Sequence, residues 1–225
     1  VAIVGAGFAG LGAAIALRRA GRDDFVIIER AASVGGTWRD NTYPGVACDV
    51  PSHLAGFAAH PNPSWSGTYA TGDEIRTYLE RIVDAEDLRG RLRLRAAMRW
   101  ADWDAAAEVW RIGTGEPGAA QTDEDVIVAD VLVLACGRLT EPSIPRIAGL
   151  ETFSGPLFHS ARWDHSADLA GARVGIVGTG ASAIQIVPEL ARTASNVTLF
   201  QRTPAWIVPR GGDAYSDADR ARFAA

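Results

Sequence analysis

The chain has 225 residues, 48% of them hydrophobic, which is enough for one large domain or two small ones. Its net charge of −5 excludes a general electrostatic attraction to nucleic acids or anionic membranes, and no hydrophobic run is long enough to cross a bilayer. The two cysteines are too few for a disulfide framework and are typical of a reducing compartment. We therefore expect a cytoplasmic protein that binds neither nucleic acid nor membrane. The composition indicates no particular oligomeric state.

The first predicted unit is a strand, a helix and a second strand, with a glycine-rich turn after the first strand. Residues 1–4 predict a short buried strand, residues 9–20 a helix, and residues 25–29 a strand parallel to the first. The turn directs backbone N–H groups and a helix N-terminus at a pyrophosphate, which is typical of dinucleotide binding. Its glycines are Gly5, Gly7 and Gly10.

A carboxylate, Glu29, ends the second strand about 20 residues after the turn, the usual spacing in such units. A carboxylate here accepts hydrogen bonds from the ribose hydroxyls of an adenosine and would repel a 2′-phosphate. The alternative is an ordinary solvated charge at a strand end. Because the glycine-rich turn precedes it, we interpret Glu29 as a ribose ligand. The first nucleotide is then FAD or NAD and not NADP.

Residues 33–67 are rich in glycine, proline, serine and asparagine and predict a long, ordered, functional loop. A Gly-Gly pair in it allows the backbone to approach a ligand closely. Its aromatic residues could wall a flat ring, although aromatic side chains more often only pack. Asp49, if it is buried beside a flavin, could orient a cationic partner, and we interpret Cys48 as a small buried hydrophobic residue. The candidate ligand residues of this loop are Gly36, Thr37, Trp38, Tyr43 and Asp49.

An amphipathic helix is predicted over residues 73–88, capped by Thr71 or Asp73. The residues on its hydrophobic face are Ile75, Leu79, Ile82 and Val83. Strand-like runs follow at residues 91–100, 109–113 and 126–134, and glycine and proline predict a turn at 113–118. These segments predict a β-meander inserted into the first nucleotide-binding domain.

Prolines and a glycine between residues 142 and 149 indicate a linker and a domain boundary. Residues 173–208 then repeat the order strand, glycine-rich turn, helix, strand. Pro188 inside this second helix predicts a kink, and the polar residues after Gly212 predict one more helix.

The second unit has Gln201 and Arg202 where the first has Glu29. A guanidinium can pair with a 2′-phosphate through two hydrogen bonds, so the change of charge favours NADPH at this site. The alternative is an ordinary surface arginine. The residues expected at the second nucleotide are Gly178, Gly180, Ser182, Arg202 and Thr203.

The segment between the linker and the second turn carries the pattern F-x-G-x-x-x-H-x-x-x-W-D. Its residues are Phe153, Gly155, His159, Trp163 and Asp164. Taken alone, His159 and Trp163 could pair through their spacing or only pack. The pattern resembles that of the Baeyer–Villiger monooxygenases, a group within the class B flavoprotein monooxygenases. Trp163 distinguishes this group from related enzymes that oxidise nitrogen or sulfur.

Two further segments support the resemblance. Residues 35–53 resemble the family's flavin-side loop, and residues 200–204 resemble its NADPH-binding strand end. Ala135-Cys136-Gly137 departs from the family's usual Ala-Thr-Gly.

The resemblance implies an α/β fold with two Rossmann-like dinucleotide-binding domains. Residues 1–140 would form the FAD-binding domain with its inserted helix and β-meander, and residues 141–225 a linker and the start of the NADP-binding domain. The implied cofactors are FAD and NADPH, without a metal. The implied reaction inserts one atom of O₂ into a ketone through a flavin peroxide, giving an ester or lactone. Catalytic roles fall to Asp49 and to His159, the latter as a coupling element between the domains and not as a proton donor to substrate.

The resemblance implies that both domains are incomplete in this chain and that the family's flavin-facing arginine would lie beyond Ala225. We therefore expect a piece of a longer enzyme that turns over little or nothing alone. Three alternatives stay open: an N- or S-oxidising flavin monooxygenase, a flavin-dependent dithiol reductase, and a nucleotide-binding fragment without activity. The lack of a Cys-x-x-Cys pair counts against the reductase. The sequence does not identify the ketone.

Overall fold

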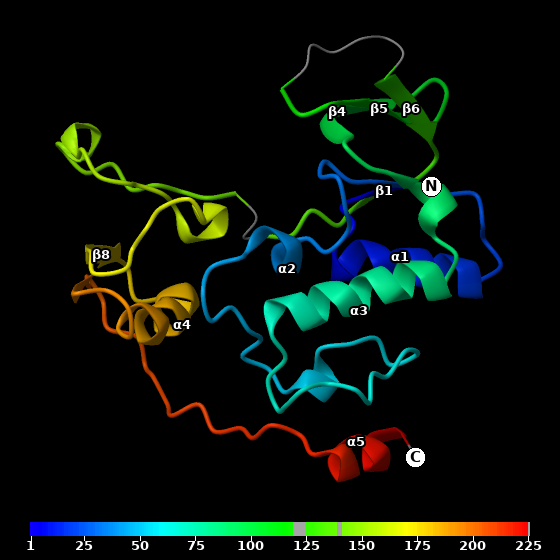
Figure 1. Cartoon of the computed structure of the whole chain (residues 1–225). Helices are drawn as coiled ribbons and strands as arrows, with labels where there is room; N and C mark the ends of the chain where they lie inside the picture. Colours follow the sequence, from blue (N-terminus) through cyan, green and yellow to red (C-terminus); the bar gives the residue numbers. More distant parts are fainter. Residues whose placement is uncertain (119–124, 139–140, 225) are drawn as a thin grey trace. The chain divides into compact units, whose positions relative to one another are not determined.

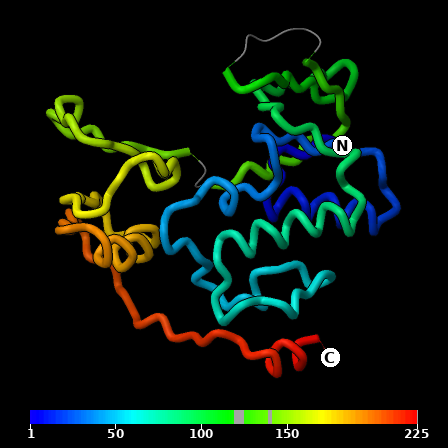
Figure 2. Tube along the Cα trace, in the orientation of Figure 1, coloured from blue at the N-terminus to red at the C-terminus, as the bar shows by residue number. Residues whose placement is uncertain are grey.

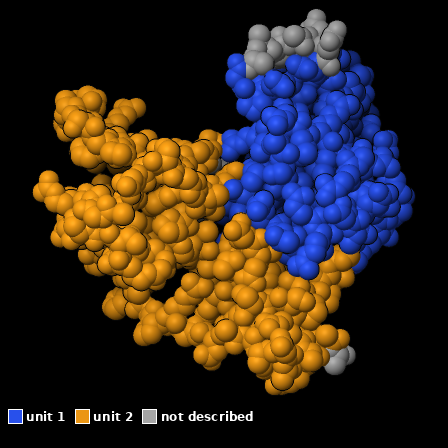
Figure 3. All heavy atoms as spheres, in the orientation of Figure 1, with its two compact units in different colours: residues 1–39, 75–140 blue, residues 40–74, 141–225 orange. Residues whose placement is uncertain are grey.

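The computed structural model describes residues 1–118, 125–138 and 141–224. The chain divides into two compact units (Figure 3): residues 1–39 and 75–140 form unit 1, and residues 40–74 and 141–225 form unit 2. Each unit contains both helices and parallel strands, so the predicted α/β class is confirmed. The predicted domain boundary, between residues 140 and 141, adjoins residues 139–140, which lie outside the described residues, and it stays a prediction.

Unit 1 is built on a parallel sheet with the strand order β3-β2-β1-β7 (Figure 1). The central strand β1 pairs in parallel with β2 on one side and with β7 on the other. All three residues of β1 are buried, as expected for a strand whose two faces are both covered. The bounds are β1 Ala2–Val4, β2 Val26–Ile28, β3 Leu92–Arg93 and β7 Leu132–Leu134.

Helices α1 (Phe8–Arg19) and α3 (Gly72–Ala85) run side by side in unit 1 (Figure 2), with the rings of Phe8 and Tyr78 in contact at 6.3 Å. The predicted hydrophobic face of α3 is confirmed, because all four of its residues are at most 3% exposed. Its capping residue is Thr71, whose Oγ1 accepts a hydrogen bond from the backbone N–H of Glu74.

The Glu74 carboxylate completes this cap by accepting hydrogen bonds from the N–H and O–H groups of Thr71 and Ser66. Burial alone would raise the pKa of Glu74, but these hydrogen bonds outweigh it and lower the pKa below its ordinary value of 4.5. The stability that the charge contributes is therefore complete above pH 4.5 and is lost as the pH falls through the lowered pKa.

We expect Glu74→Gln to reduce the free energy of unfolding at neutral pH by about 0.5 kcal/mol, since the position is only half-buried and glutamine can still cap. The difference from wild type should shrink as the pH falls below 4.5. Urea unfolding of both proteins at pH 7 and at about pH 3 measures it. An equal difference at the two pH values would contradict the assignment.

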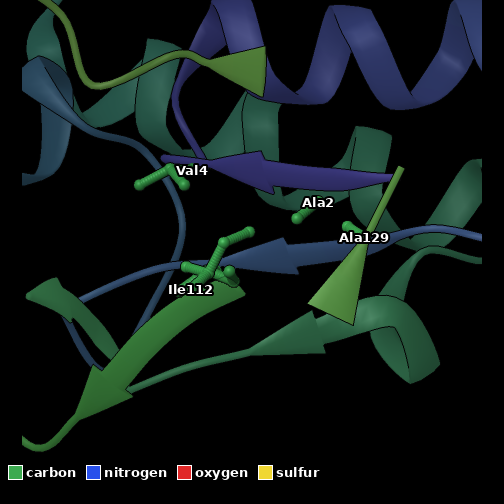
Figure 4. Packing of buried hydrophobic residues seen from close by; sticks show 5 residues of the cluster. Ala2, Val4, Ile112 and Ala129 are labelled. Carbon is green, nitrogen blue, oxygen red and sulfur yellow. The ribbon is translucent and has the colours of Figure 1, made fainter. Parts of the chain in front are cut away.

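The β-meander packs on this sheet through one hydrophobic cluster (Figure 4). Its antiparallel strands have the order β4-β5-β6. Ile112 of β5 points toward Ala2 and Val4 of β1, and Ala129 of β6 closes the same cluster. The bounds are β4 Ala97–Asp104, β5 Val109–Gly115 and β6 Val126–Ala129.

Two predictions for this region need correction. The run 91–100 is not one strand: β3 joins the parallel sheet, and β4 begins the meander. The turn predicted at 113–118 begins later, because Gly113 and Gly115 lie inside β5. A Cβ on Gly113 would stand 2.1 Å from Nε1 of Trp100 on the neighbouring strand. The glycine therefore makes room for a cross-strand indole and does not mark a turn.

In unit 2, β8 (Arg173–Val177), α4 (Ala181–Leu190) and β9 (Asn196–Phe200) form the second strand–helix–strand unit, and its two strands are parallel. Pro188 lies in the last turn of α4, which continues to Leu190. An extended segment then leads to α5 (Asp217–Ala224), the helix predicted after Gly212 (Figure 2).

The long loop contains the four-residue helix α2 (Thr37–Asp40) and a 3₁₀ turn, η1. Among the described residues, 3₁₀ turns are η1 Ser52–Leu54, η2 Arg89–Arg91, η4 Leu150–Thr152 and η5 Ser160–Arg162. Over the described part of the chain, no helix has the length and hydrophobicity that a membrane span requires.

Candidate nucleotide-binding sites

The first glycine-rich turn leaves no room for a side chain at Gly5 or at Gly10. Gly5 has a φ of +106°, and a Cβ on it would lie 2.5 Å from the carbonyl oxygen of Ala135. A Cβ on Gly10 would lie 1.8 Å from the carbonyl oxygen of Gly5, so α1 can approach the turn only at a glycine. Gly7 is the N-cap of α1, and the backbone of Gly36 lies against it.

Glu29 is 5% exposed, which rules out the alternative of a solvated charge. Its carboxylate accepts hydrogen bonds from the backbone N–H of Ala6 and of Ala31, each at 2.9 Å. Arg39 forms an ion pair with it at 3.1 Å. The carboxylate therefore fixes the turn itself, since Ala6 lies between its first two glycines. Oε1 contacts both Ala31 and Arg39, whereas Oε2 accepts the N–H of Ala6 and has a second lone pair that can accept a ligand hydroxyl.

The second turn repeats the backbone of the first. Gly178 has a φ of +107°, and its N–H donates to the carbonyl of Phe200, as that of Gly5 donates to Ile28. Gly180 is the extended N-cap of α4, as Gly7 is of α1. Ala183 takes the place of the third glycine and is buried. A Cβ on Gly178 or Gly180 would meet no atom of the described chain within 4 Å.

The two polar residues predicted at the end of β9 are at the surface. Arg202 and Thr203 are exposed just beyond the end of β9. The hydroxyl of Thr179 in the turn donates to the carbonyl of Thr203 at 3.3 Å, so this strand end lies beside the turn. Ser182 is half-buried in the first turn of α4.

The predicted flavin residues are divided between the two units. Gly36, Thr37 and Trp38 belong to unit 1, with Thr37 exposed and Trp38 half-buried at the start of α2. Tyr43 and Asp49 belong to unit 2. Asp49 is exposed, so the burial on which its predicted role depended is not present in this structure.

Tyr43 is buried in a hydrophobic cluster with Ile186 and Leu190 of α4, and its hydroxyl donates to Oε1 of Gln185 at 3.0 Å. Its described contacts are therefore those of a packed core residue, and the role as a ring wall stays a prediction. Cys48 is 6% exposed, which confirms its interpretation as a small buried residue.

The linker pattern orders its own backbone. The ring of His159 caps η5, because its Nδ1 accepts the N–H of Ala161 at 3.1 Å. The neutral ring then carries its proton on Nε2. A Cβ on Gly155 would stand 2.8 Å from the ring of Phe153. Trp163 follows η5 directly and packs on the Tyr43 cluster, with Phe158 in edge contact at 5.1 Å.

Asp164, the last residue of the pattern, ends the capped segment. Its carboxylate accepts hydrogen bonds from the hydroxyl and then the backbone N–H of Ser166, and these lower the pKa of Asp164. Hydrogen bonds of the His159 and Asp164 side chains therefore hold the backbone on both sides of Trp163.

Two residues that hold these segments were not predicted. Arg39 pairs with Glu29, and Gln185 contacts the loop at Tyr43. The basic residue after the Gly-Gly pair was a signal for the first contact. The sequence carries no signal for the second, because 142 positions separate its partners.

These features belong to a known class of protein. The profile of the flavin-binding monooxygenase-like family (FMO-like) matches residues 1–219, and the chain belongs to this family. Over 221 residues it is 53% identical to a Baeyer–Villiger monooxygenase of Streptomyces coelicolor, covering 98% of this chain and 41% of that protein. A Baeyer–Villiger monooxygenase of Pseudomonas aeruginosa is 45% identical over 223 residues, covering 99% and 41%.

Solved structures give the same picture. A cyclohexanone monooxygenase from Rhodococcus sp. Phi1 bound to NADP⁺ matches with a TM-score of 0.86 at 33% identity, covering 98% of this chain and 41% of that one. The complex of OTEMO with FAD and NADP matches with a TM-score of 0.85 at 34% identity, covering 99% and 43%. The chain thus spans about two fifths of the length of these relatives.

Proposed function

We propose that the chain contributes the FAD site and part of the NADPH site of a Baeyer–Villiger monooxygenase, which converts a ketone into an ester or lactone with O₂ and NADPH. The observation that carries this proposal is the pair of turns with equal backbone geometry, one followed by the buried Glu29 and the other by the exposed Arg202. Two such turns serve two dinucleotides whose ribose substituents differ in charge. The names of the relatives support the reaction type.

The residues present fit both cofactors. At the first turn, the N–H groups at the start of α1 would hold the FAD pyrophosphate, and Glu29 would accept a ribose hydroxyl. At the second, the start of α4 and Ser182 would hold the NADPH pyrophosphate, and Arg202 and Thr203 would contact the 2′-phosphate. When bound, the two cofactors supply the hydride and the activation of O₂.

The remaining site residues of the proposal act by position. The backbone of Gly36 lies against Gly7, and Thr37 and Trp38 follow it at the start of α2. All three residues would lie along the flavin. Tyr43 and Asp49 would complete its surroundings, with Asp49 orienting a cationic group. His159 would couple the domains through the segment that it caps. We propose residues 1–140 and 141–225 as these domains, in a cytoplasmic enzyme.

Replacement of Arg202 by alanine tests the cofactor assignment. A charge-assisted pair with a phosphate is worth about 2 kcal/mol, so we expect the KM for NADPH to rise on the order of 30-fold while the KM for NADH changes little. Steady-state NADPH and NADH oxidation by the full-length protein measures the ratio. Arg192→Ala, an exposed arginine paired with Glu189, is the matched control. An unchanged ratio in Arg202→Ala would remove the support from the charge contrast.

The reaction itself is tested with the full-length protein. Anaerobic NADPH should bleach the flavin, and aerobic turnover with simple ketones should give esters or lactones. Thioether oxidation alone decides nothing, because both types of flavin monooxygenase perform it. Oxidation of amines and thioethers without any ketone product would assign the protein to the N- or S-oxidising type. A protein that is purified without flavin and binds no added FAD would refute both the Baeyer–Villiger and the N- or S-oxidising assignment.

A further inference from the structure

The side-chain amide of Gln185 in α4 forms hydrogen bonds with the backbone of the loop that carries Asp49, in the way that a peptide group of a neighbouring strand would. Its Nε2 donates to the carbonyl of Ala47 at 2.9 Å, and its Oε1 accepts the N–H of Ala47 at 3.3 Å. The same oxygen accepts the hydroxyl of Tyr43 at 3.0 Å. One amide thus satisfies both backbone groups of Ala47, a pairing that few other side chains can reproduce.

The backbone between these contacts is fitted closely to the same helix. Gly45 has a φ of +80°, and a Cβ on it would stand 2.8 Å from the carbonyl oxygen of Gln185 and 2.9 Å from Cγ of Glu189. The Tyr43 side chain packs on the following turn of α4. The loop is therefore held by hydrogen bonds, by close backbone approach and by a buried ring, all on one helix.

A second side chain of unit 2 contacts the next peptide of the loop. Arg210 donates from Nη2 to the carbonyl of Cys48 at 3.4 Å, while its guanidinium lies 4.7 Å from the ring centre of Tyr69. The carbonyls of two successive residues, Ala47 and Cys48, are thus each held by a side chain from residues 141–225. Asp49 is the next residue.

We propose that Gln185 is a positioning residue that couples the NADPH-binding helix to the Asp49 loop, an inference that rests on the proposed function. Gln185 lies just over one turn from Gly180, the N-cap where α4 would receive the coenzyme. A displacement of α4 on coenzyme binding would move Ala47 as well, because the Gln185 side chain is hydrogen-bonded directly to Ala47. Under this proposal Gln185 contacts neither cofactor. It fixes the position of the Asp49 loop relative to the start of α4, and these two segments contact the cofactors.

The test uses the full-length holoenzyme and the variant Gln185→Leu, which keeps the size of the side chain and removes both hydrogen-bonding groups. We expect amide hydrogen exchange over residues 43–49 to rise roughly a hundredfold, because the variant removes three hydrogen bonds and each is worth roughly fivefold. NADP⁺ should protect these amides in wild type and not in the variant. The rate of flavin reduction at saturating NADPH should fall by about tenfold to a hundredfold, as misalignment does, with both nucleotides still bound.

Two further variants separate positioning from general damage. Asn196→Leu removes an exposed amide at the start of β9, away from the loop, and should leave exchange and reduction at their wild-type values. Tyr43→Phe removes one of the three hydrogen bonds and should raise exchange at 43–49 by a smaller factor. If Gln185→Leu does not fold, Tyr43→Phe decides, and wild-type exchange in it would overturn the inference.

Wild-type exchange and reduction rates in Gln185→Leu would also overturn the inference while leaving the proposed function intact. A wild-type protein that binds neither FAD nor NADPH would refute the proposed function instead, and the two failures are therefore distinguishable.

Discussion

Gly10→Ala is expected to prevent stable packing of α1 on the first turn and with it the binding of FAD. The added Cβ would stand 1.8 Å from the carbonyl oxygen of Gly5, a backbone atom that no side-chain rotation can move away. Alanine gains about 1 kcal/mol over glycine in a helix, but overpacking of this kind costs about 3 kcal/mol or more. The net effect is destabilising, and thermal unfolding and the FAD content of the purified full-length protein measure it.

Gly7→Ala is the matched control in the same turn. Its Cβ would lie 3.7 Å from the nearest atom, the Cα of Gly36, and Gly7 has a φ of −89°, which alanine adopts readily. We expect Gly7→Ala to fold with a stability close to wild type and to lose FAD affinity, because the methyl group faces the position proposed for the pyrophosphate. Equal melting temperatures for the two variants would contradict the distinction between a packing glycine and a ligand glycine.

The sequence predicted the segments whose pattern is local. Short hydrophobic runs predicted β1, β2, β8 and β9, and a glycine-rich turn after β1 and after β8 predicted the helix that follows each. The hydrophobic spacing and the cap predicted α3. In each case the pattern that predicts the element lies within about 15 neighbouring residues. The two glycine-rich turns can be compared from the sequence for the same reason.

The errors and omissions concern contacts between distant segments. Gly113 was assigned to a turn because glycine is a common turn residue. Its contact with Trp100 depends on the register between β4 and β5, which no local pattern reveals. The packing of Tyr43 in a cluster with α4 was not predicted, and its role at a ligand stays a prediction. The role suggested for Asp49 depended on burial, and Asp49 is exposed. No local pattern determines which element covers a loop residue, so burial in the long loop could not be predicted.

Glu29→Ala is expected to lower the stability of unit 1 by about 3 kcal/mol, because it removes the acceptor for two backbone N–H groups and the partner of a mostly buried arginine. Glu29→Gln keeps one acceptor and should lose only about 1 kcal/mol. Arg39→Ala leaves both backbone hydrogen bonds in place, and its cost should fall between those of the two variants. These values refer to flavin-free protein, so that bound FAD adds nothing to the unfolding free energy.

An exposed ion pair provides the control for Glu29. Asp84 and Arg89 form one at the surface, and Asp84→Ala should leave the urea midpoint almost unchanged because water screens that pair. The cost of Glu29→Ala should also persist at high salt, since burial at 5% exposure shields its contacts from counterions. A cost that disappears in high salt would mean that Glu29 acts as a surface charge after all. It would then be available to a ribose without helping to build the turn that presents the pyrophosphate site.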